Sequence, residues 1–343
     1  MTALWLALLT LFGVVGAALL FTHWWTCRIE ARFPPVGDII DLGKSVIHIV
    51  ERAPIGPERG AVLLVHGASA NHADMMAALG GPLAALGFRV LAVDRPGHGW
   101  SSRAPGRDAA SPARQAALIR AALASCGVEQ AVVAAHSWAG ALGLAMALDA
   151  PSFTRALVLL APASHPWPGG IDWRYTLAAT PALGWLFRRL VVTPAGLIAM
   201  PAGVRSVFAP NRPPDGFSAA TKLPLVLRPA HFLANAEDLV DLKRNIERLA
   251  PRYGQIRAPT AIVTGDCDGV VYAHIHSLGC ARDIPGATLT TLAGVGHSPH
   301  HSAPDKVVAA ILEVERRARR GGLPAEDRQL TACEVRPIRH PGR

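Results

Sequence analysis

Charge is missing from the beginning of this sequence, because the first 27 residues contain no Asp, Glu, Lys or Arg. Lysine is rare throughout: four of the 34 basic residues are lysine, so the excess over 25 acidic residues comes mainly from arginine. Cysteine is sparse as well. An odd number of widely spaced cysteines excludes a disulfide framework and paired zinc ligands, and it favours a reducing compartment. The five are Cys27, Cys126, Cys267, Cys280 and Cys333.

Patterns typical of nucleic-acid binding are also lacking. No zinc-finger, helix-turn-helix or aromatic-basic RNA-binding motif occurs, so we expect no nucleic-acid partner. The end of the chain is nevertheless basic, with eight arginines and three acidic residues from Arg316 to Arg343. A basic tail can contact anionic lipid or nucleic acid. We interpret residues 321–343 as a solvated, disordered end.

The uncharged beginning is an apolar segment from Ala3 to Phe21. At about 1.5 Å per residue it can cross a hydrocarbon core of about 30 Å. Trp5 and the pair Trp24-Trp25 suit the two membrane interfaces. A signal peptide would begin with basic residues and have a shorter apolar stretch, and a buried core helix would have a polar face. We therefore predict a membrane anchor helix over residues 1–27, with the lipid bilayer as its partner, and a linker over residues 28–37.

The orientation of this anchor follows from the basic residues around it. None precedes the apolar segment, whereas Arg28, Arg32 and Lys44 follow it. Segments rich in Lys and Arg stay on the cytoplasmic side of a membrane. We expect a single-pass protein of a bacterial inner membrane, with its amino terminus outside and the rest of the chain in the cytoplasm.

Beyond the linker, short apolar runs alternate with helical stretches. Continuous apolar runs are typical of strands that are buried on both faces in a parallel sheet. Their alternation with helices predicts a doubly wound α/β fold with a mostly parallel sheet, preceded by a β-hairpin over residues 38–51. Strands are expected at 61–65, 88–93, 131–135, 156–160, 261–264 and 288–292, and helices at 73–86, 112–126, 139–148 and 304–320.

The alternation stops between about residues 165 and 250, where aromatic residues and prolines are frequent and the pattern is helical. Ligands of open α/β sheets bind outside the carboxyl ends of the strands. We therefore expect a helical cap over residues 165–250, inserted between core segments 38–164 and 251–320. We also expect removal of this lid to change substrate preference more than it changes the core fold.

Three loops at the ends of expected strands contain Ser137, Asp268 and His297. Ser137 stands between an apolar strand and a helix, in Ala135-His136-Ser137-Trp138-Ala139-Gly140, which is the pattern of a nucleophile elbow. A serine hydroxyl is a poor nucleophile unless an imidazole takes its proton and a carboxylate orients that imidazole. The three loops together provide these groups.

The order Ser, Asp, His, with His66-Gly67 after one strand and Asp94-Arg95-Pro96-Gly97-His98-Gly99 after the next, resembles the α/β-hydrolase superfamily. The resemblance extends over about residues 38–320. It implies that Ser137 is the nucleophile, His297 the base and Asp268 the acid. The backbone N–H groups of Ala68 and Trp138 would form the oxyanion hole. Alanines at positions 135 and 139 depart from the usual glycines.

Nearby residues compete for two of these roles. The superfamily usually places its acid three residues after a glycine, here Gly265, which favours Asp268 over Asp266. His300 and His301 compete with His297, but we expect them in the following loop or at a helix start.

Other histidines have simpler interpretations. His66 and His98 are expected to order their own loops. His274 and His276 lack a carboxylate partner, so we interpret them as surface residues and predict no metal site.

Together these features predict a membrane-anchored serine hydrolase that cleaves an ester or similar acyl bond through an acyl-enzyme, acts on a small, apolar acyl substrate and needs no cofactor. The same fold also supports an acyltransferase, a carbon–carbon bond hydrolase or a cofactor-free haloperoxidase. Dehalogenases and epoxide hydrolases have an aspartate in place of Ser137, which argues against them. A non-catalytic membrane-bound binding protein is the alternative from another class.

Overall fold

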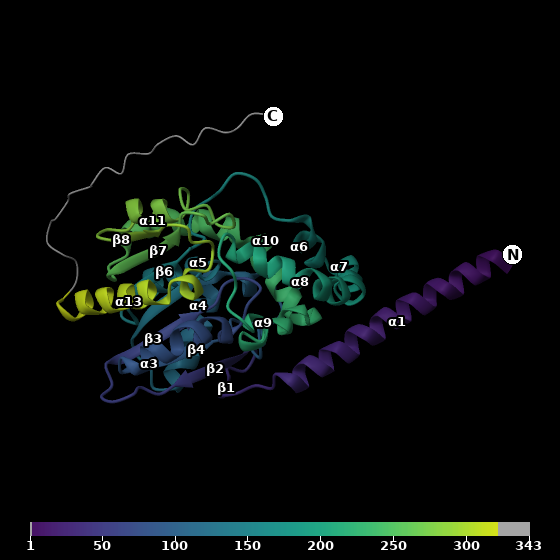
Figure 1. Ribbon diagram of the computed structural model, residues 1–343, viewed down its shortest axis with the longest axis horizontal. Coiled ribbons are helices and arrows are strands. Elements are labelled where there is room, and N and C mark those ends of the chain that lie inside the picture. Colours follow the sequence, from purple (N-terminus) through teal and green to yellow (C-terminus); the bar gives the residue numbers. More distant parts are fainter. Residues whose placement is uncertain (1, 322–343) are drawn as a thin grey trace.

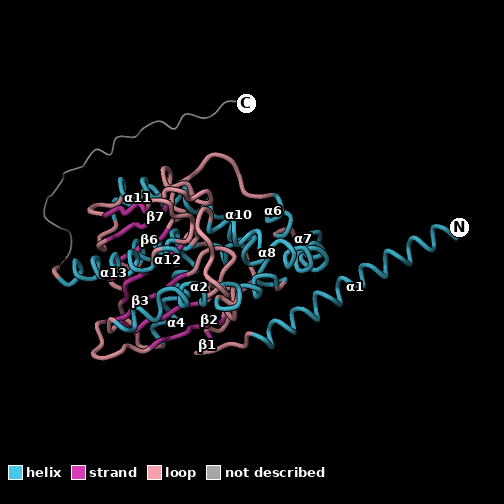
Figure 2. The backbone as a smooth tube through the Cα atoms, in the orientation of Figure 1, coloured by secondary structure: helices cyan, strands magenta, loops and turns pink. Residues whose placement is uncertain are grey.

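A computed structural model describes residues 2–321 of the chain, so the predicted basic tail lies outside the described residues except for Gly321. One sheet of eight strands forms the centre, and helices cover both of its faces (Figures 1 and 2). This arrangement confirms the predicted doubly wound, mostly parallel α/β fold.

The strands follow the order β1-β2-β4-β3-β5-β6-β7-β8 across the sheet. The first two form an antiparallel hairpin, and β2 pairs antiparallel with β4, whereas all later pairings are parallel. The strands are β1 (Asp38–Asp41), β2 (Val46–Arg52), β3 (Gly60–Val65), β4 (Phe88–Val93), β5 (Ala131–His136), β6 (Thr154–Leu160), β7 (Thr260–Gly265) and β8 (Thr288–Leu292).

Two hydrophobic clusters, one on each face of the sheet, hold the core helices. One packs α4, α5 and α11 against the sheet, and the other packs α2, α3 and α13. The core helices are α2 (His72–Met75), η1 (Met76–Gly80), α3 (Gly81–Ala85), η2 (Arg107–Ala110), α4 (Pro112–Ser125), α5 (Ala139–Asp149), η5 (Ala250–Gln255), α11 (Ser277–Asp283), α12 (Pro299–Ser302) and α13 (Pro304–Arg319).

Two expectations about these elements need correction. Strand β8 is not buried on both faces: only Leu292 at its end is buried, because β8 is an edge strand that pairs with β7 alone. The helix expected over residues 73–86 is divided into α2 and α3 by a π-helical turn, η1.

Between β6 and β7 the chain forms a group of helices that we call the cap. Its elements are α6 (Trp173–Ala178), α7 (Ala182–Phe187), the π-helical turn η3 (Arg188–Val192), α8 (Thr193–Phe208), α9 (Phe217–Ala220), η4 (Leu223–Leu227) and α10 (Pro229–Leu249). In Figure 2 the helices α6, α7 and α8 lie between the sheet and the N-terminal helix.

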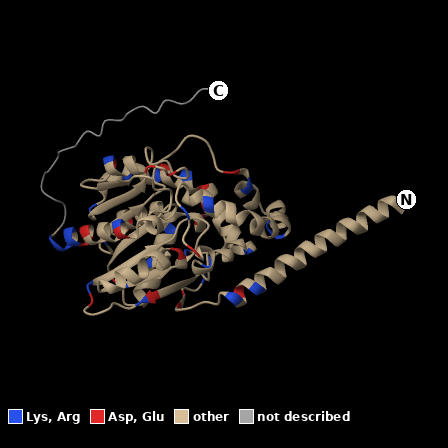
Figure 3. Ribbon diagram, viewed as in Figure 1, with Lys and Arg blue, Asp and Glu red and all other residues tan. Residues whose placement is uncertain are grey.

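The N-terminal helix α1 (Thr2–Arg32) continues five residues beyond the expected end of the anchor at Cys27, through half of the expected linker. It is long and apolar enough to cross a membrane. It projects away from the sheet (Figure 1), and Figure 3 shows charged residues only at its end nearest the domain. Near this end α1 contacts η3, α8 and η4 of the cap.

Candidate active site

Ser137 occupies a sharp turn between β5 and α5, with φ of 54°. The left-handed region costs a non-glycine residue about 1–2 kcal/mol, so the surrounding packing must hold this conformation. A Cβ atom on Gly140 would lie 2.5 Å from the Cβ atom of Pro162, which explains the glycine there. Ala135 and Ala139 are fully buried, so the turn accommodates a methyl group at both positions.

A chain of hydrogen bonds joins Ser137, His297 and Asp268. The Ser137 hydroxyl donates to His297 Nε2 over 2.8 Å, and His297 Nδ1–H donates to Asp268 Oδ2 over 2.8 Å. The other oxygen of Asp268 accepts from the backbone N–H groups of Val270 and Val271. The structure therefore brings the three sequence-predicted residues together, with the imidazole lone pair directed at the serine hydroxyl.

Asp266, the competing carboxylate, has a different partner. Its Oδ1 accepts from the backbone N–H of Gly294 over 2.7 Å. It therefore holds the turn that leads into His297, while Asp268 contacts the imidazole.

The loop after β3 passes directly beside Ser137. A Cβ atom on Gly67 would lie 2.9 Å from the Cβ atom of Ser137, which only a glycine avoids. Ala68 follows in this loop, and Trp138 begins the turn into α5. Within residues 2–321 neither the Ala68 nor the Trp138 amide donates to another backbone group. Both amides therefore lie near Ser137 without a backbone acceptor among the described residues.

Helix α10 of the cap holds both of these loops, a role that the sequence analysis missed. The backbone N–H of Ser69 donates to Asn235 Oδ1 over 2.7 Å, and Asn235 Nδ2 donates back to the Ser69 hydroxyl. The indole N–H of Trp138 donates to the carbonyl of Asp238 over 2.9 Å. Asn235 and Asp238 are three residues apart, which places them on one face of a helix. This spacing is the feature of the sequence that could have indicated the role of α10.

The Asp238 side chain also forms a buried ion pair. It accepts from Arg95 Nη1 over 2.5 Å and from Arg103 Nη1 over 2.6 Å, and Gln115 donates to it as well. Arg95 and Asp238 are completely buried, and the Arg95 guanidinium lies 3.9 Å from the ring centre of Trp138. A buried charge is tolerated only when it is paired. The cap is therefore joined to the core by an ion pair next to the site.

Further buried polar residues support His297 from behind. His136 is neutral because burial lowers its pKa well below the ordinary value, and its Nε2–H donates to the carbonyl of His297 over 2.9 Å. His300 and His301 lie at the start of a helix, in α12, and both donate to the carboxylate of Asp74. Burial alone would raise the pKa of Asp74, but these two histidines outweigh it and hold that pKa well below its usual range.

Three further histidines have structural contacts. His66 orders its loop as expected: its Nδ1–H donates to Gly67 and its Nε2 accepts the N–H of Arg95, while burial lowers its pKa to about 3. His98 lies in its turn and accepts from Arg95. The expectation that His274 and His276 are surface residues is confirmed for His274, which is exposed, and wrong for His276, which is buried. The Nδ1 of His276 accepts two backbone N–H groups of the β6–α6 connection.

Among residues 2–321, two clusters have donor atoms close enough for a metal ion: His48, His72 and Asp94, and the Asp74, His300 and His301 group. In both clusters the carboxylate oxygens already accept hydrogen bonds from the imidazoles. Asp94 also accepts the backbone N–H groups of His72 and Trp100. Hydrogen bonding therefore accounts for both groups without a metal ion.

Comparison with known proteins places this chain in a family. Residues 62–310 match the Alpha/beta hydrolase family. The chain is 28% identical over 262 residues to the "Magnesium-chelatase 30 kDa subunit" of Rhodobacter capsulatus, which covers 75% of this chain and 88% of that protein. It is 26% identical over 231 residues to the 2-hydroxy-6-oxo-6-phenylhexa-2,4-dienoate hydrolase of Burkholderia cepacia, covering 63% and 73%.

A solved structure of a bacterial membrane phospholipase A superposes with a TM-score of 0.62 at 21% identity, covering 92% of this chain and 99% of that one. At this identity the likeness shows the fold alone. The family match extends over more than half of the chain. The chain therefore belongs to the alpha/beta hydrolase family, and it is a hydrolase.

Proposed function

We propose that this protein is a membrane-anchored serine hydrolase that cleaves an ester or a similar acyl bond. The observation that carries the proposal is the chain of two 2.8 Å hydrogen bonds from Ser137 through His297 to Asp268, with Ser137 held at a strained turn. The proposed roles are nucleophile for Ser137, general base and acid for His297, and orienting carboxylate for Asp268.

The reaction follows from these positions. The Ser137 oxygen attacks the substrate carbonyl carbon while its proton passes to His297 Nε2, and Asp268 keeps the other imidazole proton on Nδ1. The negative charge on the carbonyl oxygen is stabilised by the N–H groups of Ala68 and Trp138. His297 then protonates the leaving alcohol, and an acyl-enzyme remains on Ser137. Water then attacks the acyl carbon while His297 takes one of its protons. His297 returns that proton to the Ser137 oxygen, and the acid is released.

Carbon–carbon bond hydrolysis is the second candidate. It is favoured by the relative from Burkholderia cepacia, which is named as the hydrolase of an oxo acid. The same serine, histidine and carbonyl-binding amides would serve this reaction.

The proposed membrane anchor is α1. Its 31 residues carry charge only after Cys27, and large apolar side chains such as Leu9 and Phe12 are exposed along it. The name of the membrane phospholipase A, which has the same fold, is consistent with this placement. Arg28 and Arg32 at the end of α1 favour a cytoplasmic catalytic domain. Alkaline phosphatase and a fluorescent protein, fused in turn to the carboxyl terminus, test that orientation.

Covalent labelling tests the nucleophile. The full-length protein in detergent should react with a fluorophosphonate probe and hydrolyse p-nitrophenyl esters, whose chain lengths define the acyl preference. Ser137→Ala should abolish labelling and lower turnover by about 10⁴-fold or more, because triad members act as a unit. Ser125→Ala, at an exposed serine of α4, is the matched control. Near-normal turnover by a folded Ser137→Ala protein would refute the assignment.

A further inference from the structure

The cap contains a second helical segment that is long and apolar enough to span a membrane, although it is not buried. Helix α7, η3 and α8 continue one another over Ala182–Phe208, 27 residues in all. Large apolar side chains are exposed along this segment, with exposed fractions from 41 to 84%: Leu183, Trp185, Leu186, Val191 and Ile198. Such a concentration of exposed apolar surface is typical of an interaction site.

The charged residues within this segment all have one sign. Residues 182–208 contain three arginines and no aspartate or glutamate. Arg188 is buried and donates to the carbonyl of Ala178. Arg189 and Arg205 are therefore the two that can face lipid. Helices that lie in a membrane interface combine apolar residues with basic ones, and anionic headgroups attract the basic side chains. This composition therefore complements an anionic lipid surface and not an arbitrary apolar partner.

The contact with α1 defines the depth of the Ala182–Phe208 segment relative to the membrane. The Thr22 hydroxyl donates to the backbone carbonyl of Arg189 over 2.6 Å. Thr22 directly follows Phe21, the last residue of the apolar run in α1. If that run fills the hydrocarbon core, η3 lies where α1 leaves it. Figure 1 shows α7 and α8 beside α1, on the side of the domain from which α1 projects.

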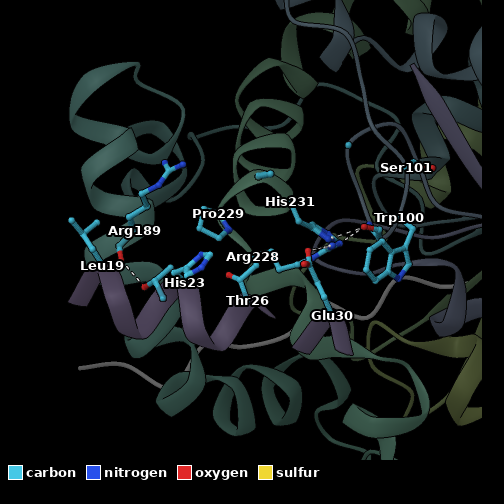
Figure 4. A pocket seen from close by; sticks show the side chains of 14 residues that line it. Leu19, His23, Thr26, Glu30, Trp100, Ser101, Arg189, Arg228, Pro229 and His231 are labelled. Atoms are coloured by element: carbon cyan, nitrogen blue, oxygen red, sulfur yellow. Dashed lines mark hydrogen bonds and ion pairs between the residues drawn. The ribbon is translucent and has the colours of Figure 1, made fainter. Parts of the chain in front are cut away.

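A cavity of about 380 Å³ lies between α1 and the domain, beside the contact of Thr22 with Arg189 (Figure 4). One end is at Leu19, within the apolar run, and the other is at Trp100 and His231. Its volume is within the usual range of about 300–1,000 Å³ for small-ligand sites. The cavity therefore extends from the expected membrane surface toward the hydrolase domain.

We propose that the Ala182–Phe208 segment lies in the headgroup region of the leaflet from which α1 emerges, with anionic lipids around Arg189 and Arg205. The cap is then a second membrane contact beside α1, and the cavity opens to molecules dissolved in the bilayer. This inference rests on the proposed membrane anchor.

Site-specific photocrosslinking of the full-length protein tests the contact. The photoreactive residue p-benzoylphenylalanine is placed at Leu183 or Ile198, and the protein is reconstituted in phosphatidylcholine bilayers with or without phosphatidylglycerol. Phe12 in α1 is the positive control. Leu278 is the matched negative control, because it is 51% exposed in α11, at the far end of the domain from α7 (Figure 1). The products are identified by mass spectrometry.

We expect lipid adducts at Leu183, Ile198 and Phe12, none at Leu278, and a higher yield at Ile198 when phosphatidylglycerol is present. A protein–protein adduct at Leu183 and Ile198 would show that a second copy covers the segment, and it would overturn the inference. Absence of any adduct at both positions, with lipid adducts still formed at Phe12, would also overturn it. Equal yields with and without phosphatidylglycerol would refute the role of the arginines. Absence of adducts at Phe12 would instead refute the membrane anchor.

Discussion

At the scale of single residues, the proposed catalytic groups are positioned by the backbone before a substrate binds. The Asp268 carboxylate accepts three hydrogen bonds: one oxygen accepts two backbone N–H groups, and the other accepts from His297. Asp266 is only two residues away, but its oxygen accepts from Gly294. Two similar carboxylates therefore have different partners.

Replacing these two carboxylates separates their roles. Asp268→Asn is expected to lower kcat/KM by about 10⁴-fold, because an amide can donate to the imidazole and select the wrong tautomer. Asp266→Asn keeps an oxygen that accepts from Gly294, so we expect kcat/KM close to that of the unmodified protein. The measurement is p-nitrophenyl ester kinetics, with folding checked by circular dichroism. Similar losses in two folded variants would contradict the assignment of Asp268.

Asn235 is expected to be a positioning residue. Asn235→Ala removes the contacts that hold Ser69, next to the proposed oxyanion donor Ala68, so kcat should fall about tenfold or more while KM changes less. Asn245→Ala is the control, since Asn245 lies in the same helix and bonds only to its own backbone turn. Equal changes in kcat and KM for Asn235→Ala would indicate a merely structural role.

At the scale of elements, helix α10 belongs to the core as much as to the cap. Its Asp238 is the carboxylate partner of Arg95, which is completely buried. Deletion of residues 165–245 would leave that guanidinium without a carboxylate. The structure therefore reverses our expectation for the deletion: we now expect loss of the core fold before any change in substrate preference.

A single substitution measures this connection. Asp238→Ala should lower the free energy of unfolding by about 3–5 kcal/mol, because it leaves a buried arginine charge unpaired. Asp241→Ala, one turn further along α10 and partly exposed, should change it by less than about 0.5 kcal/mol. Urea unfolding of both variants in the same detergent provides the comparison. Equal free energies of unfolding for Asp238→Ala and Asp241→Ala would show that the ion pair does not join the cap to the core.

At the scale of the whole molecule, buried histidines link folding to pH. Burial lowers the pKa of seven of them below the ordinary value of 6.5, to about 3 for His66 and about 4 for His276. These seven therefore stay neutral in the folded protein at pH values where the unfolded chain takes up protons. The other five are His98, His136, His165, His231 and His300.

Stability should consequently fall in acid. Below pH 6.5 the unfolded state binds more protons than the folded state, so the contribution of these histidines is complete above pH 6.5 and is lost as pH falls toward their folded pKa values. Each fully neutral histidine contributes up to about 1.4 kcal/mol per pH unit in this window. Urea unfolding at pH 7.5, 6 and 5 measures the change. Equal unfolding free energies at pH 7.5 and 5 would contradict it.

Features that depend on local patterns could be predicted from the amino-acid sequence alone. Strand and helix positions follow from hydrophobic periodicity, and Ser137 stands out because a strand, a small-residue turn and a helix follow one another directly in the chain. Only β8 was mistaken for a buried strand, since its place at the sheet edge is not a local property.

The tertiary structure alone decided which distant groups meet. The sequence could rank Asp268 above Asp266, but only the packing of two loops directs one carboxylate to His297 and the other to Gly294. It also decided that His276 is buried and that α10 holds the loops beside Ser137. Contacts between residues a hundred or more positions apart depend on how helices and sheet pack together, and short-range periodicity carries no information about that packing.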